Sequence, residues 1–262
     1  MVDTHAHLYD EQFDGDRDAV IARAVSCGVG RMLLPNIDAQ TVQPMLDTCR
    51  QYPGRCFPML GLHPTSVDKD FEQQLEVIGA YLDHTKVVAI GEIGVDLHWD
   101  KQYIGQQLEA FRIQIGWAKK YRLPLSIHCR KSYNEVMAVL KKEQDGSLTG
   151  VFHCFPGNVR QAEEVIQLGF MLGIGGVVTW KNTEMATVVQ LIDMKHILTE
   201  TDAPYLSPIP FRGKRNESAC VYNIVQKIAA LKSMSANEAA SITDANAERI
   251  FPGIAKYPDS GR

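Results

Sequence analysis

Histidines and acidic residues occupy the ends of several short apolar segments of this sequence. In the segment VDTHAH, His5 and His7 are two residues apart, so the alternation of a β-strand directs both imidazoles to one face. Further histidines and acidic residues with this placement occur in AIGEIG, SIHC, VFHC and TETD. The residues that share this placement, and that we predict as metal ligands, are His5, His7, Glu92, His128, His153 and Asp202.

This combination of side chains points to divalent metal ions. A single histidine at a strand end is ordinarily a hydrogen-bonded core or surface residue. That role does not explain five of eight histidines at equivalent positions, the four above and His63 in GLHP. Burying so many titratable groups is costly unless a cation pairs with them. Imidazole with carboxylate suits Zn, Mn, Fe or Ni, and also Mg when waters complete its shell.

Six ligands exceed the three or four that a catalytic zinc uses, so we expect two divalent metal ions (Mg, Mn, Zn or similar), and Glu92 can bridge them. Thiolates are not part of this set. Cys129 and Cys154 each follow a histidine, so strand alternation should turn both away from the metal as packing residues.

The elements that position these residues alternate along the chain. Amphipathic stretches, clearest at residues 103–122, 132–142 and 158–168, separate eight apolar segments and predict helices between strands. The predicted strands are MVDTH, GRMLLPN, CFPMLGLH, VVAIGEIGV, PLSIHC, GVFHCF, FMLGIGGVV and HILTETD. Strands that alternate with helices indicate an α/β protein with a parallel sheet.

An open doubly wound sheet fits this alternation as well as a closed barrel does. Eight repeats favour a TIM-type (β/α)8 barrel, in which the C-terminal ends of all strands share one rim and build the active site. The candidate ligands lie at those ends, and only a shared rim would bring them together, so they favour the barrel. C-terminal helices are expected at 221–232 and at 236–250, where Ser235 is an N-cap with Glu238 three residues on.

The totals of the sequence limit the remaining classes. A length of 262 residues fits one barrel domain over residues 1–262, with 255–262 as a flexible tail. The six cysteines form no CxxC pair and no signal peptide precedes the first strand, which indicates the cytoplasm. No apolar run is long enough to cross a membrane. A net charge of −4 argues against a broad basic face for duplex DNA, and oligomeric state is not predicted.

Taken together, these segments resemble the TatD family of metal-dependent nucleases, within the wider amidohydrolase class. The resemblance rests on VDTHAHL, GLHP, GEIGVD, PLSIHCR, FHCFPG, GGVVTWK, TETDAPYLSPIPFRGKRNES and NAERIF. It implies that His5, His7 and Asp202 bind one metal, that His128 and His153 bind the second, and that Glu92 bridges them. It also implies a DNase, often a 3′→5′ exonuclease on single strands, that uses Mg or another divalent ion.

The sequence departs from the family pattern at three places near the substrate loops. Ser218 follows Asn216-Glu217 where the family has Pro, HCFPG replaces HCFSG, and Leu97-His98 stands where tyrosines are common. None of these departures removes a ligand.

The expected mechanism is attack of a metal-activated water on phosphorus. The candidate catalytic residues are Asp202, which would accept the proton of that water, Glu92 and Glu200. Glu200 lies two residues before Asp202 and should face the same way, either to orient a metal-bound histidine or as a structural ion pair.

Substrate contacts are predicted around the same strand ends. His63 is either a phosphate contact or a structural residue. Basic residues there would bind phosphates of short or single-stranded DNA, the alternative being surface salt bridges. These candidates are Arg130, Lys181, Arg212 and Lys214. Three aromatic residues could stack on an unpaired base or serve only packing, namely Trp99, Tyr205 and Phe211.

Two rival functions use the same residues. A binuclear hydrolase of a small ester, lactone or amide is the first, but many such enzymes bridge their metals with a carboxylated lysine on the fourth strand, where this chain has Glu92. The second is a non-catalytic metal-binding scaffold, which we would expect to have lost at least one of the six ligands.

Overall fold

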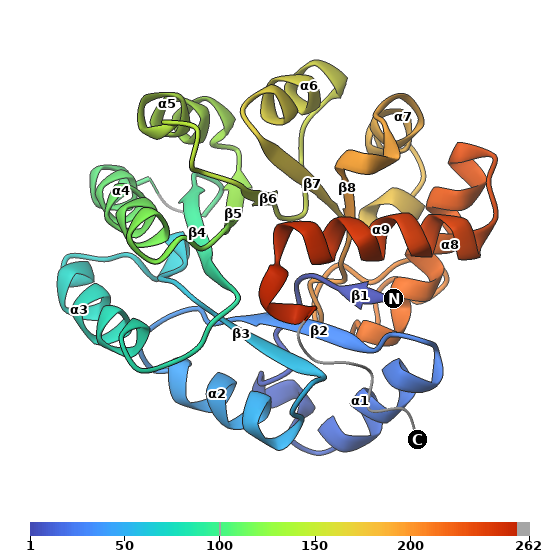
Figure 1. Ribbon diagram of the computed structural model, residues 1–262, viewed down its shortest axis with the longest axis horizontal. Helices are drawn as coiled ribbons and strands as arrows, with labels where there is room; N and C mark the ends of the chain where they lie inside the picture. The colour runs from blue at the N-terminus through green and yellow to red at the C-terminus, as the bar shows by residue number, and fades with distance from the viewer. Residues whose placement is uncertain (100, 256–262) are drawn as a thin grey trace.

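Eight parallel strands form one sheet in chain order, and helices surround it as a ring (Figure 1). The structure, a computed structural model, describes residues 1–99 and 101–255. The strands are β1 (Val2–Asp3), β2 (Arg31–Pro35), β3 (Cys56–Leu60), β4 (Ala89–Asp96), β5 (Leu125–Arg130), β6 (Gly150–Phe152), β7 (Phe170–Ile174) and β8 (Ile197–Thr199). All eight predicted segments contribute a strand.

The sheet closes between its first and last strands. The backbone N–H of Thr4 donates to the carbonyl of Thr199 at 3.0 Å, and Ala6 forms a parallel bridge with Ala203. The TIM-type (β/α)8 barrel is therefore confirmed, and an open doubly wound sheet is excluded.

The helices follow the predicted positions closely. They are α1 (Arg17–Ser26), α2 (Val42–Gln51), α3 (Phe71–Leu82), α4 (Ile104–Tyr121), α5 (Tyr133–Glu143), α6 (Val159–Gln167), α7 (Met185–Leu191), α8 (Val221–Lys232) and α9 (Ala236–Ile250). Where the bounds of predicted and observed helices differ, they differ by one residue. At the start of α6, for example, Asn158 lies outside the helix as its N-cap, and its side chain accepts the backbone N–H of Gln161. No helix in the described ranges is long and apolar enough to span a membrane.

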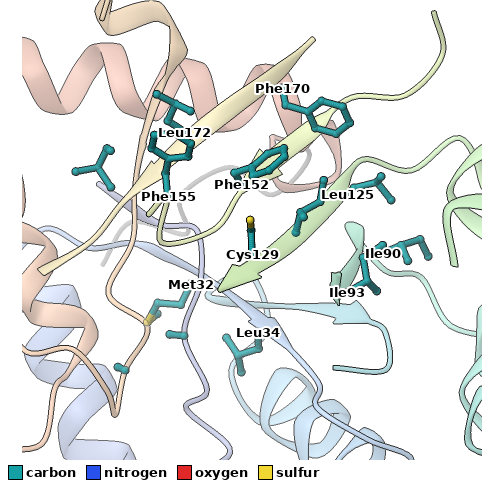
Figure 2. Packing of buried hydrophobic residues seen from close by; sticks show 14 of the residues in the cluster. Met32, Leu34, Ile90, Ile93, Leu125, Cys129, Phe152, Phe155, Phe170 and Leu172 are labelled. Carbon is teal, nitrogen blue, oxygen red and sulfur yellow. The ribbon is translucent and has the colours of Figure 1, made fainter. Parts of the chain in front are cut away.

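Alternate residues of each strand pack on opposite sides of the barrel wall. In β2, Met32 and Leu34 belong to the large cluster between strands and helices, part of which Figure 2 shows, whereas Leu33 belongs to a second, smaller cluster. This smaller cluster draws residues such as Val151 and Leu198 from several strands, so it fills the barrel interior. The same alternation directs polar side chains inward at the other end of the strands.

Helix α9 lies across the barrel and closes its N-terminal end (Figure 1). Ala247, Phe251 and Ile254 pack into the interior cluster. The Ser235 side chain accepts the backbone N–H of Glu238, so this predicted N-cap is confirmed. The Asn246 amide donates to the carbonyls of Met194 and Ile197 and ties α9 to the start of β8. The open, C-terminal end is left for chemistry. Most of the predicted tail, residues 256–262, lies outside the described residues.

Gly94 gives a direct test of the packing between β4 and β5. Its φ is +139°, and an added Cβ would lie 2.1 Å from the carbonyl oxygen of His128. We predict that Gly94→Ala lowers the free energy of unfolding by about 3 kcal/mol, because backbone must move to relieve both the clash and the strain. Urea denaturation monitored by circular dichroism measures this change.

Gly116, an exposed residue inside α4 with nothing within 4 Å of an added Cβ, supplies the matched control. Gly116→Ala should raise the free energy of unfolding by about 0.5–1 kcal/mol, since alanine restricts the unfolded chain and favours helix. Equal stability of Gly94→Ala and the native protein would contradict the described contact.

Candidate metal centre

All six predicted ligands meet at the C-terminal end of the barrel. Five of them line a cavity of about 950 Å³, and His5 is fully buried against the others. The strand ladder continues past β1, where the backbone N–H of His7 donates to the carbonyl of Ala203 at 2.7 Å, so His5 and His7 face the centre together. Their ring centroids are 5.2 Å apart.

Glu92 occupies the middle of this centre. Its Oε2 lies 3.0 Å from Nε2 of His5, and its Oε1 lies 2.7 Å from Nδ1 of His128. Burial alone would raise the pKa of Glu92, but the imidazoles of His63, His5 and His153 hold that pKa well below its usual range. Glu92 is therefore a buried carboxylate whose two oxygens face different histidines.

Asp202 is the carboxylate that reaches the cavity. Its side chain is 15% exposed, against 3% for Glu92. Its Oδ1 lies 3.5 Å from Nε2 of His7 and 3.6 Å from Nε2 of His153. Burial favours a raised pKa for Asp202, yet His153 and the neighbouring histidines lower it. Asp202 is thus ionised and open to a small molecule in the cavity.

The orientation of His7 follows from a tyrosine that the sequence did not suggest. The Tyr9 hydroxyl donates to the carbonyl of Pro35 at 2.7 Å and lies 3.1 Å from Nδ1 of His7. Because that hydroxyl uses its only proton on Pro35, Nδ1 of His7 must be the donor to Tyr9. The lone pair of His7 is then on Nε2, which faces Glu92 and Asp202.

Glu200 lies behind His153. Its Oε1 is 2.9 Å from Nδ1 of His153 and accepts the backbone N–H of Cys154 at 2.5 Å. Burial would lower the pKa of His153, but Glu200, Glu92 and Asp202 raise it to about 10. The negative charge that raises this pKa would also attract a divalent cation.

Asp96, at the end of β4, is a second residue that the sequence did not single out. It is 1% exposed, and its Oδ2 lies 2.8 Å from Nε2 of His128. Burial would raise the pKa of Asp96, but hydrogen bonds from His128 and from the backbone of His98 lower it to about 2. The sequence contains a pattern that predicts this position: Asp96 follows Glu92 by four residues on one strand, so both side chains should face the same way.

His63 approaches the centre from the end of β3. Its Nδ1 accepts the backbone N–H of Thr65 at 3.1 Å, so the proton of the neutral ring is on Nε2. That Nε2 lies 3.3 Å from Oε1 of Glu92 and 3.2 Å from Nδ1 of His128. His63 thus presents an N–H donor to the centre.

The side chains form three groups in which one ligand atom from each residue lies within 4.8 Å of the others. These groups are His5 with His153 and Asp202, His5 with His7 and Glu92, and His63 with Glu92 and His128. The family resemblance grouped His153 with His128, whereas here His153 lies nearer to His5, on which its ring stacks at 3.4 Å.

The basic residues predicted to contact phosphate, called the rim below, lie only partly at the cavity. Arg130, Lys181 and Arg212 line it, but Lys214 is exposed and does not. Arg130 lies over Trp99 and Arg212 lies over Trp180, at 5.3 Å and 4.6 Å from the ring centroids. Lys214 stands in a loop outside the helices and strands, so strand alternation does not determine where its side chain lies. Trp99 and Tyr205 line the cavity as well, and Phe211 does not.

The two cysteines differ. Cys129 is buried and packs in the hydrophobic core, as predicted (Figure 2), although it also borders the cavity. The prediction for Cys154 is wrong, since this residue is partly exposed and lines the cavity. Strand β6 ends at Phe152 and Cys154 has a φ of +42°, so the alternation that would have turned it away has already stopped.

The donor set fits a divalent cation. Imidazole nitrogens and carboxylate oxygens converge, and within residues 1–99 and 101–255 no lysine or arginine forms an ion pair with Glu92, Glu200 or Asp202. A barrel that carries such a centre at the C-terminal ends of its strands defines a metal-dependent hydrolase.

Comparison with known proteins agrees with this class. Residues 2–252 match the family model described as TatD related DNase. The uncharacterized metal-dependent hydrolase YabD of Bacillus subtilis is 41% identical, over 96% of this chain and 98% of that protein. The chain belongs to the TatD family, and the predicted family and the prediction of a metal-dependent hydrolase are confirmed.

Two further relatives bear on fold and activity. The crystal structure of YjjV, a TatD homologue from Escherichia coli, has a TM-score of 0.90 at 30% identity and covers 96% of this chain and 98% of its own. A protein of Erwinia tasmaniensis named 3′-5′ ssDNA/RNA exonuclease TatD is 33% identical, over 96% of this chain and 99% of that protein.

The hydrogen bond between Tyr9 and His7 can be tested without disturbing packing. We predict that Tyr9→Phe weakens divalent-ion affinity about 10-fold, because His7 loses the partner that fixes its Nδ1–H. Isothermal titration calorimetry with Mn²⁺ measures the affinity. Tyr133→Phe, which removes a hydroxyl bonded to Gln161 and Glu164 outside the cavity, should leave it unchanged. Equal affinities for the two variants would show that Tyr9 does not orient His7.

Proposed function

We propose that this protein hydrolyses phosphodiester bonds of DNA with two divalent ions, as a 3′→5′ exonuclease on single strands. The observation that carries the proposal is the position of Glu92, whose Oε2 faces His5 while its Oε1 faces His128. One carboxylate in contact with two sets of histidines is the arrangement that a bridging ligand requires. The name of the Erwinia tasmaniensis relative supports the choice of a nucleic-acid substrate.

In this proposal His5, His7 and Asp202 would hold one ion, His128 and His153 would hold the other, and Glu92 would bridge them. His153 can serve either ion, because its Nε2 lies between the two carboxylates, 3.6 Å from Asp202 and 3.9 Å from Glu92. Two bound divalent ions supply Lewis acidity for phosphate and lower the pKa of a coordinated water to roughly 7.

The protein groups then have separate tasks. Asp202, the exposed carboxylate of the centre, accepts the proton of the attacking water at a carboxylate oxygen. Glu200, whose Oε1 lies 2.9 Å from Nδ1 of His153, attracts that side of the ring and leaves Nε2 for an ion. The Nε2–H of His63 donates to a phosphate oxygen. His63 is not a ligand, because the N–H of Thr65 occupies its Nδ1 and the nitrogen that faces the centre, Nε2, then carries the proton.

The rim suits a short, single-stranded substrate. Arg130, Lys181 and Arg212 are three cations around one cavity of a protein whose net charge is −4. They can hold the few phosphates next to the centre, and aromatic residues beside them offer surfaces for unpaired bases.

Removal of either central carboxylate should abolish activity. We expect Glu92→Ala and Asp202→Ala to lower kcat/KM on single-stranded DNA at least about 1,000-fold, which corresponds to roughly 4 kcal/mol of transition-state stabilisation. Glu109→Ala, on the exposed face of α4, is the control and should retain full activity. Circular dichroism checks that each variant is folded. Activity retained in either central variant would refute the assignment.

The substrate class is tested on oligonucleotides labelled at the 3′ or the 5′ end, single- and double-stranded, after EDTA treatment and with Mg, Mn or Zn added back. The proposal predicts divalent-dependent loss of the 3′ label from single strands, with no activity under EDTA. A panel of small esters and lactones is run in parallel. Faster turnover of any of these than of DNA would favour a small-molecule hydrolase instead.

The rim is tested through salt dependence. If Arg130 and Lys181 each contact one phosphate, replacing either with Ala should lower the slope of log kcat/KM against log salt by about 0.7. Lys214→Ala removes an equal charge outside the cavity and should leave the slope unchanged. If all three variants have the same slope, the rim contributes only general surface charge.

A further inference from the structure

A side pocket of about 290 Å³ adjoins the main cavity. It lies between the turn after β3, which includes η2 (Pro64–Ser66), and the segment that joins β4 to α4. Thr65, Asp96 and Trp99 line both hollows, so the two share a wall.

This shared wall is one residue thick on the side of the metal centre. Thr65 Oγ1 lies 2.6 Å from Nδ1 of His63, and Asp96 Oδ2 lies 2.8 Å from Nε2 of His128. A molecule seated in the side pocket is therefore one side chain away from residues of the centre. A group bound in the side pocket could therefore be part of the same nucleotide as a phosphate bound at the centre.

Trp99 is the side chain of the side pocket that offers the most exposed aromatic surface. At 71% it is the most exposed of the large apolar side chains found among residues 1–99 and 101–255. Its backbone is held in place, because the N–H groups of Trp99 and His98 both donate to Oδ1 of Asp96. The guanidinium of Arg130 lies over the indole at 5.3 Å from its centroid, and the His98 ring meets it edge-on at 4.8 Å; with 71% of the side chain exposed, indole surface is still open to a ligand.

The charges of the side pocket select the occupant. Its carboxylates, Asp68 and Asp96, would repel a phosphate. Pro64, Val67 and Tyr103 add apolar and aromatic surface beside Trp99. A volume just below the roughly 300 Å³ at which small-molecule pockets begin has room for one flat ring system and little more. These features suit a nucleobase.

We propose that the side pocket binds the base of one of the two nucleotides that flank the scissile phosphate, stacked on Trp99, while Arg130 remains at the main cavity for phosphate. This subsite rests on the proposed nuclease function. Stacking tolerates any base, so it gives affinity for unpaired strands without sequence preference.

The test separates binding from chemistry. A stacked base interacts with the protein equally before and during reaction, so its loss raises KM and leaves kcat unchanged. Trp99→Ala should raise KM for single-stranded DNA about 10-fold, equivalent to about 1.4 kcal/mol, and Trp99→Phe should restore most of the loss. Tyr222→Ala removes a 49% exposed aromatic side chain on α8, outside both hollows, and should change neither constant.

Abasic oligonucleotides identify the stacked base. Two substrates carry a tetrahydrofuran residue in place of the 3′-terminal or of the penultimate nucleotide. On one of them the native protein and Trp99→Ala should have equal KM, because the stacking partner is already missing. The affinity of each variant for Mn²⁺, measured by calorimetry, should equal that of the native protein.

The possible failures are distinguishable. If the native protein leaves every oligonucleotide intact with divalent ions present, the proposed function is wrong and the subsite falls with it. If the native protein cleaves DNA but Trp99→Ala has an unchanged KM, or loses affinity equally on both abasic substrates, the subsite is overturned and the nuclease remains.

Discussion

Glu92 carries a negative charge in the middle of the barrel mouth, where its side chain is only 3% exposed. An isolated carboxylate at such a place would take up a proton, because burial disfavours the charged form. Five imidazoles lie within 4 Å of it and keep it ionised, those of His5, His7, His63, His128 and His153. The rest of the centre is arranged around this charge, and a divalent cation would satisfy it more strongly than any of these rings.

The barrel supplies this arrangement with little freedom to relax. The far end of its interior is packed with apolar side chains and closed by α9, so the inward-facing polar residues are confined to the opposite end. There the rings are fixed from outside: Tyr9 holds His7, Glu200 lies against His153, and Asp96 holds His128. Each outer contact leaves the other ring nitrogen directed toward the carboxylates, which is the preorganisation that metal binding needs.

Much of this could be predicted from sequence because strand alternation and the shared rim of a barrel are simple rules. From the sequence alone they place six residues at one mouth of the barrel, namely His5, His7, Glu92, His128, His153 and Asp202. The rules failed where the chain leaves a strand, as at Cys154, or where a side chain stands on a loop, as at Lys214. They also do not predict which ring nitrogen of His7 carries the proton. That is set by the Tyr9 hydroxyl, which donates to the carbonyl of Pro35, 26 residues away in the sequence. The grouping of His153 with His5 likewise depends on packing across the barrel.

The central proposal, that Glu92 would bridge two divalent ions, is tested most directly by anomalous diffraction from crystals soaked in Mn²⁺. Two anomalous peaks roughly 3.5–4 Å apart, each next to one oxygen of Glu92, are the predicted result. One peak alone, or peaks that leave Glu92 without an ion, would contradict it.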